Sequence, residues 1–335
     1  MRIFLTFVFF LAVQPFLFGQ DIHFSQFYAS PLSLNPANTG NYVGDWRIMN
    51  NYRRQWESIT TPFLTNAIAY DRQFYLYNEN ISGGLIFISD KSGDALLKVN
   101  KIYLSGAYHK TINGHTLHVG YQVGYVQKNF SIDNLTFPDQ YDNEIGHFNS
   151  QMSNNETVNS QQLSYVDMNT GIIWGKKFNK FSVEAGLALF HINLPRETFF
   201  TNANDLHTRK IFTLGGRVDL SKKFFLLPNL LLMGTTGATD YVLGTNVGYN
   251  LPQNKIRAKS VFAGVLLRDG INRNTDAFAA IAGVNFKGLD IGVSYDYNIS
   301  DLHVASNYLG GLEISIIYTS LSTVLEKIAI PCDRY

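Results

Sequence analysis

Two groups of side chains in this sequence are of types that bind metal ions. His115 and His118 are three residues apart, so in a strand they point to opposite faces and make a poor ligand pair. The stretch 139–144 holds two aspartates, a glutamate and an asparagine, whose oxygens suit either a calcium ion or a solvated acidic loop. The sequence contains no Gly-x-Ser-x-Gly, His-Glu-x-x-His or phosphate-loop motif, and nothing nominates a Ser–His–Asp or Ser–His–Asn set. We therefore expect a non-enzymatic protein without a cofactor or a catalytic or structural metal.

The elements that carry these residues are strands, to judge from composition. The chain has 335 residues, of which 14% are aromatic and only 16% charged, against about 25% charged in ordinary soluble domains. Its 27 glycines, 19 tyrosines and 25 phenylalanines favour a long-stranded β protein over a helical one. The net charge of +1 argues against a nucleic-acid partner, which would require a clearly basic domain.

The first nineteen residues are typical of a secretory signal peptide. Arg2 supplies a positive start, residues 3–18 are mostly apolar, and the small residue Gly19 precedes the expected cleavage point. An N-terminal membrane anchor is the alternative, although Pro15 interrupts the apolar run. Cys332 is the only cysteine, so the exported chain has no internal disulfide, and no cysteine at the cleavage point offers a site for a lipid anchor.

Apolar residues alternate with small or polar ones from about residue 45 to residue 319. In 289–298 every odd residue is apolar or aromatic and every even one is small or polar, as in a strand with two different faces. About fourteen such segments occur, each of roughly 10–15 residues, where globular strands average about 5–6. They are 45–56, 63–77, 80–89, 98–110, 114–128, 164–176, 180–192, 210–221, 226–236, 238–249, 257–268, 275–286, 288–299 and 307–319.

The connections between these segments alternate in length. Short ones include Asn113-Gly114, a pair suited to a tight hairpin, and Lys287-Gly288, whereas 129–163 and 193–209 are long and polar. Residues 250–256 and 236–238 depart from the alternation. An even number of long strands with short turns at one rim predicts an all-β, transmembrane antiparallel β-barrel in the outer membrane of a Gram-negative bacterium. A secreted soluble sandwich is the alternative, because it shows the same alternation.

The faces of the segments favour the barrel. In lipid the apolar face of each strand points outward and the enclosed face carries small and polar groups. The small positions are Gly120, Gly124, Gly186, Gly244, Gly248, Gly264 and Gly292, and they are interleaved with Glu184, Asn246, Ser294 and Asp296.

Two regions lie outside the alternating strands. Residues 20–44 contain two proline steps, including Asn35-Pro36, and read as neither a regular helix nor a full strand. They form either a plug in the lumen or a loosely attached periplasmic leader. Residues 320–335 form a C-terminal tail. The domain prediction is thus a signal peptide (1–19), an N-terminal segment (20–44), a barrel (45–319) and a tail (320–335).

Several motifs resemble the PorP/SprF family of type IX secretion membrane proteins. The opening string His23-Phe24-Ser25-Gln26-Phe27-Tyr28, followed by Leu34-Asn35-Pro36-Ala37, is the most specific of them. Further matches are Tyr52-Arg53, Gln55-Trp56, Pro62, Tyr70-Asp71, 90–93, Asn134-Leu135, Phe137-Pro138, Asp167, Asn169, Gly171, 291–298, Gly310-Gly311, Glu313 and Pro331-Cys332. The resemblance spans nearly the whole mature chain, although Asp333 stands where the family pattern has proline.

The resemblance implies an outer-membrane barrel that takes part in export or surface anchoring of secreted adhesin-like proteins with a type B C-terminal sorting domain. It also implies contacts with other type IX components, among them the periplasmic ring, and a link to gliding motility. Aromatic and arginine residues are the usual anchors of an interface. The predicted partner-binding residues are His23, Phe24, Gln26, Phe27, Tyr28, Asn35, Pro36, Arg53 and Trp56. A porin or transporter for small or hydrophobic solutes is the alternative function, and aromatic residues that only fill the lumen are the alternative role.

Overall fold

The computed structural model describes most of the chain after the predicted signal peptide. The described residues are 23–58, 61–77, 79–93, 96–131, 136–142, 145–149, 152, 161–199, 204–235, 238–252, 258–271, 275–301 and 303–322. The predicted signal peptide and nearly all of the predicted tail lie outside them.

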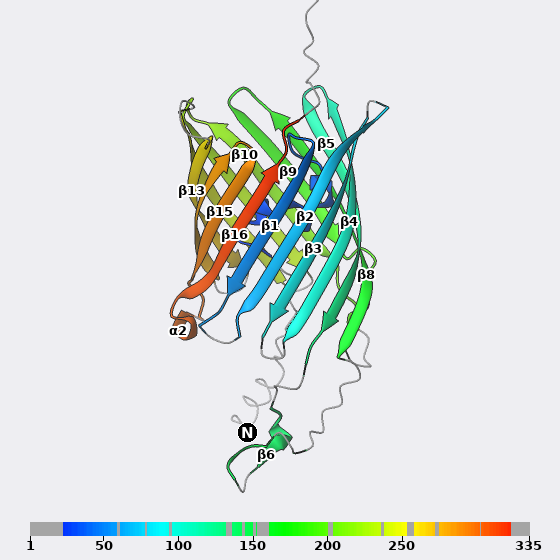
Figure 1. Cartoon of the computed structure of the whole chain (residues 1–335), viewed down its shortest axis with the longest axis vertical. Coiled ribbons are helices and arrows are strands. Elements are labelled where there is room, and N and C mark those ends of the chain that lie inside the picture. The colour runs from blue at the N-terminus through cyan, green and yellow to red at the C-terminus, as the bar shows by residue number, and fades with distance from the viewer. Residues whose placement is uncertain are drawn as a thin grey trace, which may run out of the picture.

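Fourteen antiparallel strands close into one barrel within the described residues (Figure 1). Each strand pairs with the next along the chain, and β16 pairs with β1 to complete the ring. The predicted barrel and its number of strands are therefore confirmed. The strands are β1 (Trp46–Gln55), β2 (Phe63–Leu76), β3 (Glu79–Ser92), β4 (Leu97–Ile112), β5 (His115–Asn129), β8 (Gln162–Lys177), β9 (Phe181–Phe190), β10 (Arg209–Asp219), β11 (Phe224–Thr235), β12 (Ala238–Asn250), β13 (Ser260–Gly270), β14 (Ala277–Phe286), β15 (Leu289–Asn298) and β16 (Leu309–Thr319).

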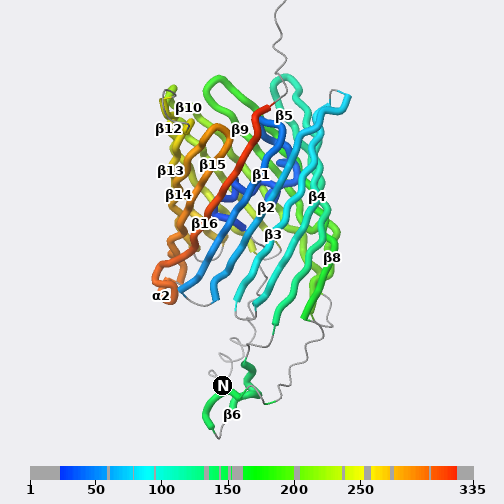
Figure 2. The backbone as a smooth tube through the Cα atoms, viewed as in Figure 1, coloured from blue at the N-terminus to red at the C-terminus, as the bar shows by residue number. Residues whose placement is uncertain are grey.

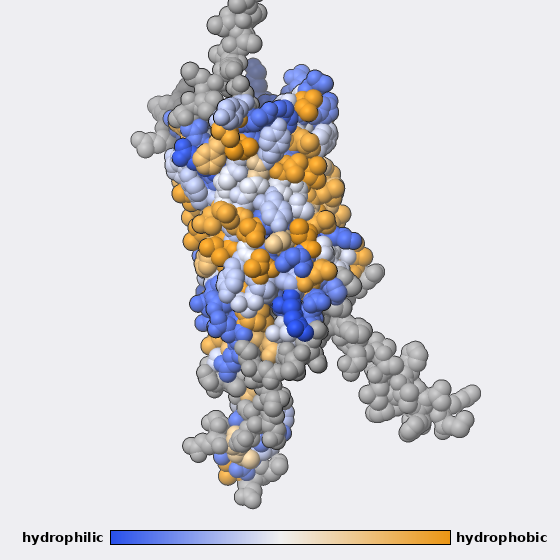
Figure 3. Space-filling model, turned by 90° about the vertical axis from the view of Figure 1, so that its right-hand side faces the viewer, coloured by the Kyte–Doolittle hydropathy of each residue, from blue (hydrophilic) through white to orange (hydrophobic). Residues whose placement is uncertain are grey.

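The alternating sequence pattern becomes the two faces of the wall. In β4, for example, Leu104 is 63% exposed on the outside, whereas Tyr103 and Ser105 face the lumen and are buried. Figure 3 shows apolar side chains gathered over the wall between more hydrophilic ends. Closure pairs the edges of the first and last strands, which satisfies backbone groups that lipid cannot hydrogen-bond.

The two rims differ in their connections. At one, which we call the short-turn rim, lie both ends of the barrel chain and tight hairpins such as Asn113-Gly114, both with the predicted positive φ. At the other, the long-loop rim, lie the connections 129–162 and 190–209. In bacterial barrels short turns face the periplasm and long loops face outward.

The described part of the N-terminal segment, residues 23–44, lies inside the barrel (Figure 2). It forms three 3₁₀ helices, η1 (Phe27–Ala29), η2 (Pro31–Ser33) and η3 (Pro36–Asn38), with prolines at the first position of the last two. Prolines and buried polar residues punctuate it every few positions, which fits short turns rather than one long helix.

Some small elements were not predicted from the sequence. The connection 129–162 holds the 3₁₀ helix η4 (Pro138–Gln140) and a two-stranded hairpin of β6 (Tyr141–Asp142) and β7 (His147–Phe148). The helix α2 (His303–Ser306) precedes β16. Among the described residues, no helix has the length and apolar character needed to cross a membrane.

Candidate functional site

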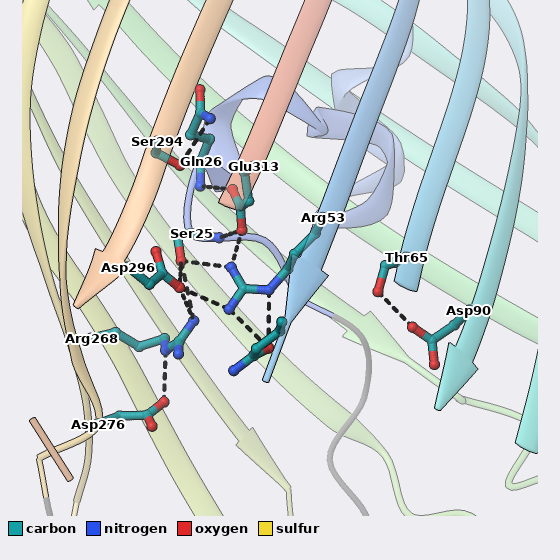
Figure 4. A network of polar contacts seen from close by, with 11 residues as sticks. Ser25, Gln26, Arg53, Thr65, Asp90, Arg268, Asp276, Ser294, Asp296 and Glu313 are labelled. Atoms are coloured by element: carbon teal, nitrogen blue, oxygen red, sulfur yellow. Dashed lines mark hydrogen bonds and ion pairs between the residues drawn. The ribbon is translucent and has the colours of Figure 1, made fainter. Parts of the chain in front are cut away.

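A buried group of charged side chains joins the start of the N-terminal segment to the wall (Figure 4). Arg53 on β1 forms ion pairs with Asp296 on β15, at 2.8 Å, and with Glu313 on β16. All three residues are at most 3% exposed. Their strands are neighbours in the ring, so the side chains converge on one point of the lumen.

The segment completes this group through its own polar atoms. The backbone N–H groups of Ser25 and Gln26 donate to the two oxygens of the Glu313 carboxylate, at 2.6 and 2.8 Å. The Ser25 hydroxyl donates to Asp296 at 2.8 Å. A carboxylate that accepts two backbone N–H groups and an arginine has most of its hydrogen-bonding capacity filled, so Glu313 fixes the direction of the chain here.

A second arginine balances the charge. Arg268 on β13 donates to Asp296 at 3.1 Å and to Asp276 at 2.7 Å. The two buried arginines therefore face two buried carboxylates, and the partly exposed Asp276 adds a third. One oxygen of Asp296, Oδ1, has no hydrogen-bond partner among the described residues. Buried charges are tolerated only when they are paired, so the group forms an interdependent unit. We call Arg53, Arg268, Asp296 and Glu313 the charge cluster.

The middle of the segment rests on glycines of three adjacent strands. Asn35 donates from Nδ2 to two wall carbonyls, at 3.1 and 3.2 Å, and its Oδ1 accepts from the N–H of Ala37. A Cβ at Gly120, Gly171 or Gly186 would lie 2.3, 2.0 or 3.2 Å from atoms of residues 35–37. The backbone of residues 36–37 therefore approaches Gly120, and the Asn35 side chain approaches Gly171 and Gly186, as closely as only glycine permits. We call these three glycines the glycine platform.

The end of the segment is held near the short-turn rim. The Asp71 carboxylate on β2 accepts from the N–H of Gly40 at 2.8 Å and from Arg47, which also donates to the Asn38 carbonyl. The Arg47 guanidinium lies 4.4 Å from the centre of the Tyr42 ring. Charged and polar contacts thus hold the segment at both ends, and close backbone packing holds it between them.

Most of the predicted partner-binding residues lie in this arrangement. Phe24 and Phe27 are buried in two separate apolar clusters. Gln26 donates to Ser294 and accepts from Ser315. Burial raises the pKa of the Tyr28 phenol to about 12, so its neutral hydroxyl accepts a hydrogen bond from Asn246.

The structure places other predicted residues apart. His23 lines a small cavity of about 20 Å³ beside Arg209 and Met233. Trp56 lies just beyond β1 at the long-loop rim, with its ring against Phe63 at 4.9 Å. Partner binding by the nine predicted residues stays a prediction.

The two histidines of the sequence analysis point to opposite faces, as expected. His118 is buried beside His109 in the lumen, whereas His115 accepts from the outward-facing Trp174. Asn143 and Glu144 of the acidic stretch lie outside the described residues. Within the described part of the chain, no three His, Cys, Asp or Glu side chains are grouped to hold a metal ion.

The wall residues that contact the N-terminal segment were not predicted from the sequence. Asp296 was assigned to the enclosed face and Glu313 to an alternating strand, but neither was linked to Arg53. Nothing in the sequence predicts Arg268, Asp71 or the three platform glycines as contacts of the segment. A usable signal exists, because charged residues on the enclosed face of a lipid-embedded strand need a partner.

A closed barrel with an apolar outer wall and its own N-terminal segment in the lumen defines an outer-membrane β-barrel protein. The family model "Type IX secretion system membrane protein PorP/SprF" matches residues 17–318, and the chain belongs to this family.

One solved structure of low sequence identity supports the fold alone. The "CymD monoaromatic hydrocarbon channel" is similar with a TM-score of 0.51 and 11% identity, covering 91% of this chain and 95% of that one. The toluene transporter TbuX of Ralstonia pickettii has a TM-score of 0.48 and 9% identity, with 89% and 94% covered. None of the curated proteins matches this chain.

Proposed function

We propose that this barrel is an outer-membrane partner of the type IX secretion system that exports or anchors a secreted adhesin-like protein through its type B C-terminal sorting domain. Family membership supports the secretion system. The observation that carries the proposal is the N-terminal segment, which is fixed to the lumen wall at the charge cluster, the glycine platform and Asp71. A barrel that serves free diffusion has no need of such a built contact.

In this proposal the N-terminal segment is a plug. Leu32, Ala37 and Thr39 are completely buried, and the segment spans from the charge cluster to the short-turn rim. Its residues therefore occupy the path that a small solute would take. A plugged lumen supports a secretion partner over an open, passive porin.

Partner contacts are assigned to the two rims. Toward the periplasm, a pocket of about 500 Å³ is lined by the end of the segment, where Val43 is 91% exposed. A component of the periplasmic ring would meet this rim. At the long-loop rim, Trp56 and the loops 129–163 and 193–209 are the surfaces available to exported cargo. We also propose a role in gliding motility through this cargo.

The test is a chain in which the predicted signal peptide is joined directly to Asp45, so that residues 20–44 are deleted. We expect an inserted barrel, recognised by its heat-dependent mobility on gels, and loss of cargo export or surface retention in immunoblots of cells and medium. The control is Gly106→Ala on the outer face of β4, which leaves the segment and both rims unchanged because its Cβ would lie 3.6 Å from the nearest atom. Unchanged surface display in the deletion contradicts a partner role for the segment.

Ion conductance distinguishes the proposed secretion role from the alternative function, a porin or transporter. We expect the intact protein in planar bilayers to stay closed and the deletion to open. Steady large channels in the intact protein favour a porin or transporter. Chains that copurify with the intact protein from mild detergent then identify the cargo.

A further inference from the structure

The outside of β3, β4 and β5 carries an ordered set of side chains near the long-loop rim. Three successive outward rows cross these strands in register. The row farthest from the rim is apolar, the next is polar, and the outermost begins with two lysines. The rows are Phe87–Ile102–Tyr125, Ser89–Asn100–Gln127, and Lys91–Lys98–Asn129.

A groove of about 380 Å³ lies over these rows. Its lining includes Phe87, Ile102 and Tyr125 as an apolar floor, and Asn100 and Lys98 toward the rim. Phe87, Ile102 and Tyr125 are 42%, 45% and 49% exposed, so they face the membrane and not the lumen. The groove is therefore open to lipid along its side.

Lys98 at the upper end of the groove and its cross-strand neighbour Lys91 are a like-charge pair. Lys91 and Lys98 are directly opposite each other across β3 and β4, and both are exposed. Like charges directly opposite destabilise a sheet. Among the described residues, neither lysine forms an ion pair with a carboxylate, although Lys110 pairs with Glu79 on the same two strands. An anion bound between Lys91 and Lys98 would remove this repulsion.

The order of the three rows, from apolar to polar to basic, indicates which class of anion would bind. Two residues along a strand cover roughly 7 Å, so the lysines lie about that far from the amide row and twice as far from the apolar floor. An amphiphile of the outer leaflet has the same order, with acyl chains toward the bilayer centre and a charged headgroup toward the rim. A lysine ammonium binds phosphate as a point charge, and basic sites next to apolar surface recognise anionic lipids.

We propose that this groove is a binding site for a phosphorylated, acylated lipid of the outer leaflet. The acyl chains lie over Phe87, Ile102 and Tyr125, the amides of Asn100 and Gln127 meet the polar part of the headgroup, and Lys91 and Lys98 bind the phosphate. The inference is independent of the secretion role and of the plug, because none of these side chains faces the lumen.

The experiment places the full mature chain in nanodiscs of phosphatidylcholine with a minor fraction of diphosphoryl lipid A, and counts retained lipid by native mass spectrometry. The variant is Lys91→Gln with Lys98→Gln. We expect about 30-fold weaker retention, because each lysine near an anionic headgroup strengthens binding about five-fold and the two factors multiply. The control is Lys222→Gln with Lys223→Gln in the turn before β11, which changes the net charge equally at the opposite rim.

Two further experiments distinguish the contribution of the phosphate groups from that of the acyl chains. We expect the intact protein to retain dephosphorylated lipid A weakly. This retention should equal that of diphosphoryl lipid A by the lysine variant. Ile102→Gln is expected to weaken retention of the lipid without affecting inorganic phosphate, which does not need the apolar floor. Because Ile102 faces the membrane, heat-dependent gel mobility first establishes that this variant is folded.

Three results overturn the proposal. The first is equal retention by the lysine variant and the intact protein. The second is full displacement of the lipid by inorganic phosphate, which describes a bare anion site. The third is a groove that is covered by a copurifying protein and excludes lipid.

Discussion

Gly120→Ala directly tests the packing of the N-terminal segment against the barrel wall. A Cβ at this lumen-facing position on β5 would lie 2.3 Å from the Ala37 nitrogen and from the Pro36 carbonyl carbon. Both are backbone atoms, so no side-chain rotation relieves the overlap. Ordinary contact begins near 3.4 Å, and the difference requires residues 36–37 to move by about 1.1 Å.

The energetic consequence follows from the bonds that such a shift breaks. The two hydrogen bonds from Asn35 to wall carbonyls are already 3.1 and 3.2 Å long, so a further ångström removes them. Each contributes about 0.5–1.5 kcal/mol net, which gives about 1–3 kcal/mol for the pair. We therefore expect the population of released segment to rise by about 5–150-fold.

A cysteine in the segment measures this population. Ser30 is 4% exposed, so in a Cys332→Ser background the single thiol of Ser30→Cys reacts with a maleimide only when the segment is released. Gly120→Ala should accelerate labelling by the factor above. Gly106→Ala is the matched control, because it lies on β4 and its Cβ would be 3.6 Å from the nearest atom. A folded Gly120→Ala protein that labels at the unperturbed rate refutes the close packing of the segment on the platform.

Two further predictions concern the charge cluster and the outer wall. Asp296→Asn leaves two buried arginines short of a counter-charge and should lower the free energy of unfolding by about 3–5 kcal/mol, whereas Asp219→Asn at the exposed pair with Arg217 should cost about 0.2–1 kcal/mol. Denaturant titration of both variants checks the difference, and equal effects contradict a buried cluster. Leu104→Arg, in the middle of β4, should destabilise folding into vesicles by about 2–4 kcal/mol, and Ile112→Arg, outward-facing at the short-turn end of the same strand, by about 0–1 kcal/mol. Equal values in urea titrations mean that Leu104 does not face lipid.

The barrel was predictable because its signal is local and repeated. Alternation of period two marks a strand wherever it persists for ten residues, and a closed barrel needs little else than many such strands and short turns. Asn113-Gly114 even gives the position of one turn to the residue. Strand ends shifted by a few residues, because backbone pairing continues after the apolar pattern stops, as at Lys110 to Ile112.

The elements that the sequence did not predict lack such repetition. The hairpin of β6 and β7 has two residues in each strand, too few for a period, and α2 has four. Tyr141 and Phe148 stabilise this hairpin by an edge-to-face contact with ring centres 5.2 Å apart. That contact depends on the pairing of the strands and leaves no pattern along the chain.

The sequence indicates that the charges of the cluster need partners, but it does not say which residues pair, for a different reason. Arg53 is 243 residues from Asp296 and 260 from Glu313 along the chain. Their proximity depends on the closure of β16 onto β1 and on the register of both strands. Composition and period fix the face on which a residue lies, but not its height in the wall, so ion pairs across the ring require the register first.

The glycine platform couples the stability of the barrel wall to the presence of the N-terminal segment. Glycine inside a strand costs about 0.5–1 kcal/mol relative to alanine, so Gly120, Gly171 and Gly186 together weaken the wall by about 1.5–3 kcal/mol. In the intact protein this cost is offset by the close approach of Asn35 and its neighbours. Once residues 20–44 are deleted, the three atoms nearest to a Cβ at Gly120, all of them in Pro36 and Ala37, are gone. Gly120→Ala should then stabilise the barrel by about 0.5–1 kcal/mol in denaturant titrations, the opposite of its effect on segment release. The same sign in both backgrounds would mean that the wall itself, and not the segment, requires glycine at this position.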